Sequence, residues 1–359
     1  MDKRRDRESN IELLRILAML GVIILHYNNP SIGGGLSFVK YGSLNYWFCN
    51  IVESIFVCAV NLFMIISAYF MASSNKRDLW KPIQLLTQVI IFSVSKYTLI
   101  SMIKCNFSIR GLIGALIPAN YFVILYIVVF IISPYINLIF EHLDSNKRKQ
   151  FICILILLFS VYPTIVDILI EVTKHSFNGL SSIGMYGSQY GYSIVNFTLC
   201  YCIGAYIRFE SERISKVNTS KLVAGIFACV TVMTIWSAMN DRIGYFTEKT
   251  AWEYCNPLVF MLAVCAFLLF KRINIKNSKF INSLAKGSFT VYLIHINLVT
   301  HLGVKLFVNN NIFILILHMA LSSVLIYFVC WIIYLVYAKF EKVAFGFIKE
   351  KIKLPLIEI

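Results

Sequence analysis

The chain contains little charge and few prolines for its length. Only 14% of its 359 residues are Asp, Glu, Lys or Arg, and it has 7 prolines. A soluble domain of this size needs far more charge to cover its surface, so the composition excludes that class of protein. We detect no internal repeat, low-complexity tract or appended soluble domain. Any chemistry is therefore expected to take place within the apolar part of the chain.

Metal-binding and secretion signals are also missing. The ten cysteines lack metal-ligand spacing and fall mostly in apolar segments, so we expect small core side chains and no metal site. No small-residue cleavage site follows the basic leader at residues 1–7. We therefore expect the first apolar segment to be a retained span and not a cleaved signal peptide.

Long apolar segments are abundant: 58% of the residues are hydrophobic and 15% are aromatic. Their lengths predict an all-α, polytopic transmembrane bundle of about ten helices, because some 20 apolar residues cross the hydrocarbon core. We expect one transmembrane domain over residues 1–345 and a basic cytoplasmic tail over 346–359. The expected spans are 10–29, 46–72, 82–103, 119–140, 150–171, 192–209, 222–239, 253–270, 287–308 and 312–338.

The net charge of +15 is explained by membrane topology. With the N-terminus inside, 24 of the 33 Lys and Arg residues lie in cytoplasmic segments, 7 lie outside and 2 lie within spans. This asymmetry is the positive-inside pattern, so we expect both termini in the cytoplasm and an even number of spans. The basic charge indicates contact with anionic membrane lipids and no nucleic-acid partner.

The first apolar segment carries two ionisable residues, Arg15 and His26, eleven positions apart. On a helix this spacing places them within about 20° of one another and roughly 16 Å apart. Ionisable side chains are costly in lipid, so both are expected to face a bundle interior or a watery cavity.

Four short patches between residues 7 and 295 have distinctive spacing. They are Arg7 to Tyr27 with Arg15-x10-His26, Asn61 to Phe70 with Ser67 and Ala68, Tyr121-Phe122 with Tyr126, Pro134 and Asn137, and Ser288 to His295 with Tyr292. In this order the patches resemble the acyltransferase 3 family of integral membrane O-acyltransferases. Ala68 stands where that family usually has glycine, and Tyr121 where it has tryptophan.

The resemblance implies transfer of an acyl group, most often acetyl, from acetyl-CoA as a co-substrate with no bound cofactor. The acceptor would be a hydroxyl of a cell-surface glycan, such as capsule, lipopolysaccharide or exopolysaccharide, or of its lipid-linked precursor. It also implies a multi-pass protein of a bacterial cytoplasmic membrane.

Three residues are the candidates for catalysis. His26 can act as the base that takes the acceptor proton, because imidazole has a reference pKa of about 6.5. Arg15 can bind a CoA phosphate or a developing oxyanion, and His295 can share the cavity with His26. The alternatives are interhelical hydrogen bonds for the histidines and an Arg15 side chain that extends to the membrane surface beside Glu12.

Six further residues are candidates for binding the donor or acceptor: Glu53, Ser67, Arg77, Lys81, Tyr126 and Tyr292. Glu53 would orient a histidine or bind a sugar hydroxyl, and Lys96 is a possible ion-pair partner for it. Arg77 and Lys81 lie in a short cytoplasmic loop and can contact CoA phosphates. Ordinary positive-inside charge explains the same two residues.

Carboxylates and aromatic residues also gather near the predicted outer face. Tyr190, Tyr192, Trp252 and Glu253 suit sugar binding, but an aromatic belt at the membrane interface has the same composition, and we favour the belt.

Two rival functions remain open. A flippase for lipid-linked glycans would favour inverted repeats or paired broken helices, and we detect neither. A membrane glycan polymerase would be expected to have a large extracytoplasmic loop, which we do not find. The prediction of a membrane O-acyltransferase therefore rests on the family resemblance of the four patches.

Overall fold

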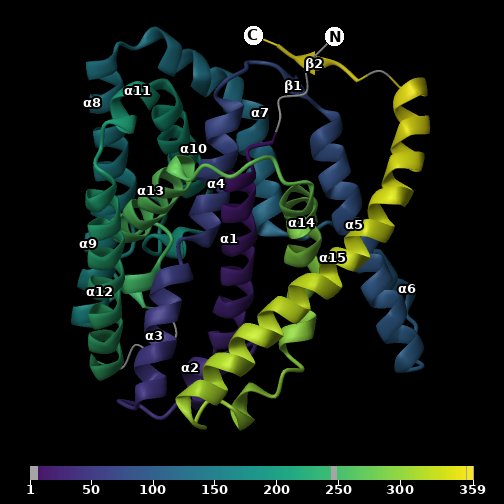
Figure 1. Cartoon of the computed structure of the whole chain (residues 1–359), viewed down its shortest axis with the longest axis horizontal. Helices are drawn as coiled ribbons and strands as arrows, with labels where there is room; N and C mark the ends of the chain where they lie inside the picture. The colour runs from purple at the N-terminus through teal and green to yellow at the C-terminus, as the bar shows by residue number, and fades with distance from the viewer. Residues whose placement is uncertain (1–6, 244–248, 353, 359) are drawn as a thin grey trace.

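The computed structural model describes residues 7–243, 249–352 and 354–358. Most of the basic leader and Lys353 of the tail lie outside these ranges. The described chain is a bundle of helices (Figure 1). Its first half contains α1 (Ser9–Asn28), α2 (Gly35–Phe38), α3 (Leu44–Phe56), α4 (Ala59–Met71), β1 (Arg77–Asp78), α5 (Trp80–Ile103), α6 (Ile109–Leu116), α7 (Tyr121–His142), α8 (Ser145–Ile156) and α9 (Tyr162–Thr173). Its second half contains α10 (Ile194–Phe209), α11 (Ser211–Ser215), α12 (Thr219–Ile243), α13 (Pro257–Arg272), α14 (Lys279–Val299), α15 (Ile312–Lys351) and β2 (Leu356–Ile357).

The predicted class, a polytopic helical membrane bundle, is confirmed. Within the described ranges, 8 helical segments are long and apolar enough to cross a membrane, by length and composition. Three of them join α-helices that follow one another: α3 with α4, α6 with α7, and α8 with α9, the last pair through a π-helical turn. The shorter α10 and the more polar α14 occupy the two remaining predicted spans.

One predicted span is displaced. The span expected at 287–308 is α14, which begins at Lys279 and ends at Val299. The sequence prediction started too late because Lys279 and Lys286 resemble a polar connector. Lys286 is exposed on the first half of the helix, so its charge does not interrupt the helical backbone.

The helix α1 lies inside the bundle and packs against α3, α4, α13, α14 and α15. Its apolar side chains Ile11, Met19 and Ile23 are almost fully buried. Between helices in a membrane such packing is stabilised by van der Waals contacts, because lipid tails are as apolar as these side chains. The packing fixes the position of the ionisable residues that α1 carries.

A second close contact joins α4 to α10. A Cβ atom added at Gly204 of α10 would lie 2.6 Å from the Cβ of Ala68 and 2.6 Å from the carbonyl oxygen of Ile65. The close backbone approach that the family obtains with glycine at position 68 is therefore provided here by glycine on the opposite helix.

The two ends of the described chain lie at the same end of the bundle (Figure 1). There β1 pairs with β2 in antiparallel register, with Arg77 opposite Ile357. This arrangement agrees with an even number of spans. The tail predicted from residue 346 does not begin as a separate segment, because α15 continues as helix to Lys351.

The segment before α13 is buried although it is not a long helix. Asn61 donates a hydrogen bond to the carbonyl of Tyr254 at 2.7 Å, and Ser160 donates to the carbonyl of Cys255 at 2.6 Å. Asn256 then caps α13 by accepting from the amide of Leu258 at 2.9 Å. These bonds hold residues 249–256 against the helices and form one wall of a cavity.

Candidate functional site

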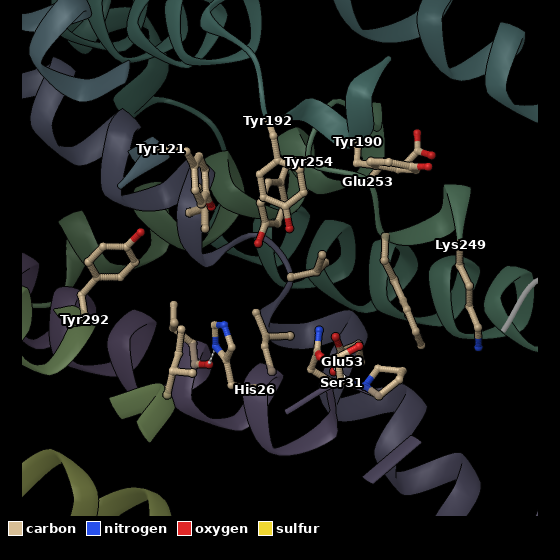
Figure 2. A pocket seen from close by; sticks show the side chains of 18 residues that line it. His26, Ser31, Glu53, Tyr121, Tyr190, Tyr192, Lys249, Glu253, Tyr254 and Tyr292 are labelled. Carbon is tan, nitrogen blue, oxygen red and sulfur yellow. Dashed lines mark hydrogen bonds between the residues drawn. The ribbon is translucent and has the colours of Figure 1, made fainter. Parts of the chain in front are cut away.

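A cavity of about 410 Å³ surrounds His26, near the last turn of α1 and away from the end of the bundle that holds the chain termini (Figures 1 and 2). It is lined by residues from α1, α3, α4, α7 and α14, from the turn between α3 and α4, and from the loops at 29–31, 190–192 and 249–254. A hollow of this size can hold a small organic molecule.

His26 and His295 meet at this cavity although 269 positions separate them. The Nδ1 atom of His26 lies 3.2 Å from Nε2 of His295, and the two rings are arranged edge to face. His295 is 0% exposed, whereas His26 lines the cavity. The two histidines are thus in contact, but only His26 lines the cavity, and His295 lies behind it.

Backbone carbonyls determine where the ring protons lie. The Nδ1 atom of His26 is 2.8 Å from the carbonyl oxygen of Val22, and Nδ1 of His295 is 2.9 Å from that of Val291. A carbonyl oxygen only accepts, so each Nδ1 carries the hydrogen in the neutral ring. The Nε2 atom of His26 consequently holds a lone pair, which is the state required of a general base.

Three tyrosines form the opposite wall. Tyr121, Tyr192 and Tyr254 direct their hydroxyl groups towards the part of the cavity that contains His26 (Figure 2). The Tyr121 and Tyr192 ring centroids are 4.9 Å apart, and those of Tyr192 and Tyr254 are 5.1 Å apart. Amphipathic rings that present both apolar faces and hydroxyl groups suit a polyhydroxylated ligand.

Charged side chains stand beside this wall. Glu53 of α3 lines the cavity and accepts a hydrogen bond from Asn28 at 3.0 Å. Lys249 also lines it, lies over the Trp252 ring at 4.5 Å and pairs with Asp241 at 2.8 Å. The suggested pairing of Glu53 with Lys96 is wrong, because Lys96 lines a different hollow.

Aromatic residues that the sequence favoured as a membrane belt also lie here. Tyr190, Tyr192, Trp252 and Glu253 all line the cavity. Glu253 accepts from the hydroxyl of Ser188 at 3.1 Å. Glu253 is buried and Trp252 half-buried, whereas Tyr190 and Tyr192 are 42% and 47% exposed, so this wall of the cavity extends from the bundle interior to its surface.

Tyr292 belongs to the site as predicted. It lines the cavity one helical turn before His295, and its hydroxyl donates to Asn120 at 3.0 Å. Asn120 also caps α7, where it accepts from the amide of Val123 at 3.2 Å. This hydrogen bond joins α14 to the start of α7.

Arg15, Lys81 and Tyr126 lie outside the cavity lining. Arg15 forms an ion pair of 3.8 Å with Glu12, one turn before it on α1. The Lys81 ammonium lies over the rings of Tyr126 and Phe130, at 5.5 and 5.1 Å from their centroids. Arg15 lies in the first half of α1 and Lys81 in the first turn of α5, and both helices begin at the end of the bundle that holds the chain ends (Figure 1).

Arg77 has a different environment from Lys81. It is 3% exposed and donates to Ser133 at 2.7 Å, to Tyr201 at 3.4 Å and to backbone carbonyls of residues 71–76. These contacts occupy its guanidinium with protein acceptors. Ser67 is half-buried on α4 and does not line the cavity.

The sequence interpretation missed Lys249, Tyr254 and Tyr121 as site residues. Tyr121 lies in a patch that was recognised, but no role was assigned to it. Tyr254 follows Trp252 and Glu253 directly before Asn256-Pro257, a helix-start signal. The sequence did contain an indication of a buried loop, because Glu253 stands between two aromatic residues shortly before this helix start.

These features define a multi-spanning membrane protein with a polar cavity around a buried histidine pair. A family model described as an acyltransferase domain matches residues 8–335. The chain belongs to this family and is a membrane acyltransferase. It matches no curated protein and no solved structure.

Proposed function

We propose that this acyltransferase transfers acetyl from acetyl-CoA to a hydroxyl group of a cell-surface glycan or of its lipid-linked precursor. The observation that carries the proposal is His26, which presents a proton-accepting Nε2 to a cavity walled by tyrosines. We place the protein in a bacterial cytoplasmic membrane, with the chain ends in the cytoplasm.

The proposed reaction is a direct transfer. Nε2 of His26 takes the proton of the acceptor hydroxyl while that oxygen attacks the thioester carbonyl. The new C–O bond forms, the C–S bond breaks, and the proton passes from His26 to the leaving thiolate. The Val22 carbonyl and the His295 lone pair lie beside Nδ1–H of His26, so both favour the transient imidazolium.

Aromatic rings with carboxylate acceptors support a sugar as the acceptor. Pyranose C–H faces pack on the rings of Tyr121, Tyr192 and Tyr254, and Glu53 and Glu253 accept from sugar hydroxyl groups. Lys249 is already paired with Asp241, which leaves the lining without an unpaired cation for an acidic sugar. We therefore favour a neutral sugar ring at the reacting position.

The donor would approach from the end of the bundle that holds the chain termini. Lys81 and Arg15 are the cations there that suit CoA phosphates. Arg15 and His26 are roughly 16 Å apart along α1, and the extended arm of CoA would bring the thioester across this depth.

Deletion of the gene in its native host tests the proposal, with the O-acetyl content of purified surface polysaccharide read by proton NMR. We expect the acetyl signals to disappear and to return with wild type or His301→Ala, but not with His26→Ala. His301 is an exposed histidine and is the matched control. Normal acetyl content after deletion would reject the acceptor class, and absence of the polymer would favour a flippase or polymerase.

A further inference from the structure

A second hollow lies between α5 and α6, on the outer side of the bundle (Figure 1). Its volume is about 470 Å³. Its lining combines two lysines with hydroxyl and amide side chains and small residues, and includes no Asp or Glu. The lining residues are Ser93, Lys96, Tyr97, Ile100, Ser101, Lys104, Asn106, Gly111, Gly114, Ala115, Ile117 and Ala119.

The two lysines have no ion-pair partner among the described residues. Both are exposed, and their spacing on α5 separates their Cα atoms by roughly 12 Å along the helix axis. The two ammonium groups can therefore approach a single anion that lies between them along the helix axis. Lys96 lies within a span, where an unpaired ammonium is costly unless it extends to an anion at the interface.

The surroundings of the hollow are apolar and exposed. No residue of α6 is buried, and Ile103, Ile109 and Ile117 are 74%, 70% and 60% exposed. In a bilayer these side chains contact lipid. An anion that reaches the two lysines from this side is therefore attached to an acyl or isoprenoid chain.

Specific contacts hold the groove open. The Tyr97 hydroxyl donates to the carbonyl of Ser108 at 2.6 Å, which ties the start of α6 to α5. A Cβ at Gly111 would come within 2.5 Å of the Tyr97 ring, whereas a Cβ at Gly114 would meet nothing within 4 Å. Gly111 thus permits the helix contact, and Gly114 borders open space.

The groove and the reaction cavity are connected along the chain. Ile117 and Ala119 line the groove, Asn120 accepts from Tyr292, and Tyr121 lines the cavity around His26. The short segment at residues 117–121 therefore contributes side chains to both hollows.

From this geometry we propose that the α5–α6 groove binds the phosphate group of an anionic membrane lipid through Lys96 and Lys104. The lipid chain lies along the exposed apolar side chains of α5 and α6. Asn106, whose backbone amide donates to the carbonyl of Ser101 between the two lysines, supplies a neutral hydrogen-bond donor to the phosphate oxygens. The same chemistry is presented by an anionic phospholipid and by an isoprenoid diphosphate carrier.

Native mass spectrometry of the full-length protein in neutral maltoside micelles tests this site. The probes are phosphatidylglycerol, a polyprenyl diphosphate, the uncharged polyprenol and inorganic diphosphate. We expect at least one of the two phosphate lipids to bind tenfold or more tightly than polyprenol and inorganic diphosphate. The lipid that binds more tightly identifies the source of the phosphate.

Two kinds of variant give the test its specificity. Lys96→Gln with Lys104→Gln removes the cations, and Gly114→Leu fills the groove, so each should weaken lipid binding at least tenfold. The controls are Lys40→Gln with Lys174→Gln, which are exposed lysines outside the groove, and Gly346→Leu, which also meets open space. Both controls should bind as wild type does.

Three results would overturn the site. Binding unchanged in the Lys96/Lys104 variant would exclude the cations, equal binding of polyprenol would reduce the site to an apolar groove, and equal binding of inorganic diphosphate would indicate a site for free anions. None of these depends on the acetyl transfer proposed above, so failure of one proposal does not affect the other.

Discussion

Two of the polar regions in this apolar bundle, around His26 and around Arg77, differ in how their side chains are used. At Arg77 the guanidinium donates to side chains and backbone carbonyls of the protein itself. At His26 the side chains face a cavity of about 410 Å³. A polar residue in a membrane span thus indicates a ligand site only where its partners leave space for the ligand.

The end of α4 explains the environment of Arg77. The last carbonyls of a helix have no partners within the helix. The carbonyl of Met71 accepts from Arg77 at 3.0 Å and from Asn137 at 3.2 Å, and that of Ser74 accepts from both residues as well. Arg77 and Asn137 therefore cap α4 from outside, which is a structural function.

The largest effect on activity is expected at the cavity. Replacing His26 with Ala removes the proposed base, and we expect kcat for acyl transfer to fall by about 10²- to 10⁴-fold. Release of CoA by the purified protein in the presence of its glycan acceptor measures this rate. Because His301 is exposed, the His301→Ala variant should keep the wild-type rate.

A drop of less than tenfold for His26→Ala would remove this residue from the proton transfer. The melting temperature should stay near the wild-type value, because the lost hydrogen bond to Val22 lies within one helix turn. A large loss of folded protein would instead mean that His26 has a structural role, as Arg77 does.

The largest effect on stability is expected at Arg77. Replacing Arg77 with Gln leaves several buried carbonyls without a donor, and we expect a loss of about 3 kcal/mol in stability. Size-exclusion chromatography after a heat ramp measures the remaining folded protein. If Arg77→Gln folds normally and only the KM for acetyl-CoA rises, Arg77 binds the donor.

Lys81 provides the matched comparison for Arg77. It is exposed and contacts only aromatic rings in the described contacts, so Lys81→Gln should leave the melting temperature unchanged. We expect KM for acetyl-CoA to rise by about fivefold, the effect of one partly exposed ion pair of ~1 kcal/mol. An unaltered KM would mean that the donor phosphates bind elsewhere.

The smallest effect concerns pH and the contact between α8 and α10. A hydrogen bond from Ser145 and the pairing with Arg148 hold the pKa of Glu210 below its ordinary value. A carboxyl group whose pKa is lower in the folded state stabilises the fold above its unfolded pKa of about 4.3 and ceases to do so as the pH falls through the folded value.

We therefore expect Glu210→Gln to lower the melting temperature slightly at pH 7, by the equivalent of at most about 1 kcal/mol. The difference from wild type should vanish as the pH falls well below 4. Thermal unfolding of both proteins across this pH range measures it, and a constant difference would exclude Glu210 as the titrating group.

Much of the fold follows from local sequence patterns. Apolar length predicts the spans, since each must cross the hydrocarbon core. The spacing of Arg15 and His26 and the order of the four patches predict the family. The structure brings Tyr292 and His295 close to His26, Tyr292 in the cavity lining and His295 in contact with the His26 ring. The error at α14 arose because exposed lysines do not end a helix in a membrane.

Only the tertiary structure decided which faces meet. The contact between His26 and His295 joins residues that lie 269 positions apart, and no local pattern specifies it. The loops at 190–192 and 249–254 look like an interfacial belt in sequence, but hydrogen bonds from Asn61 and Ser160 hold the second of them inside the bundle. Composition determines which segments can lie in a membrane. Packing and buried hydrogen bonds determine whether Arg77 caps a helix and whether Glu53 faces a cavity.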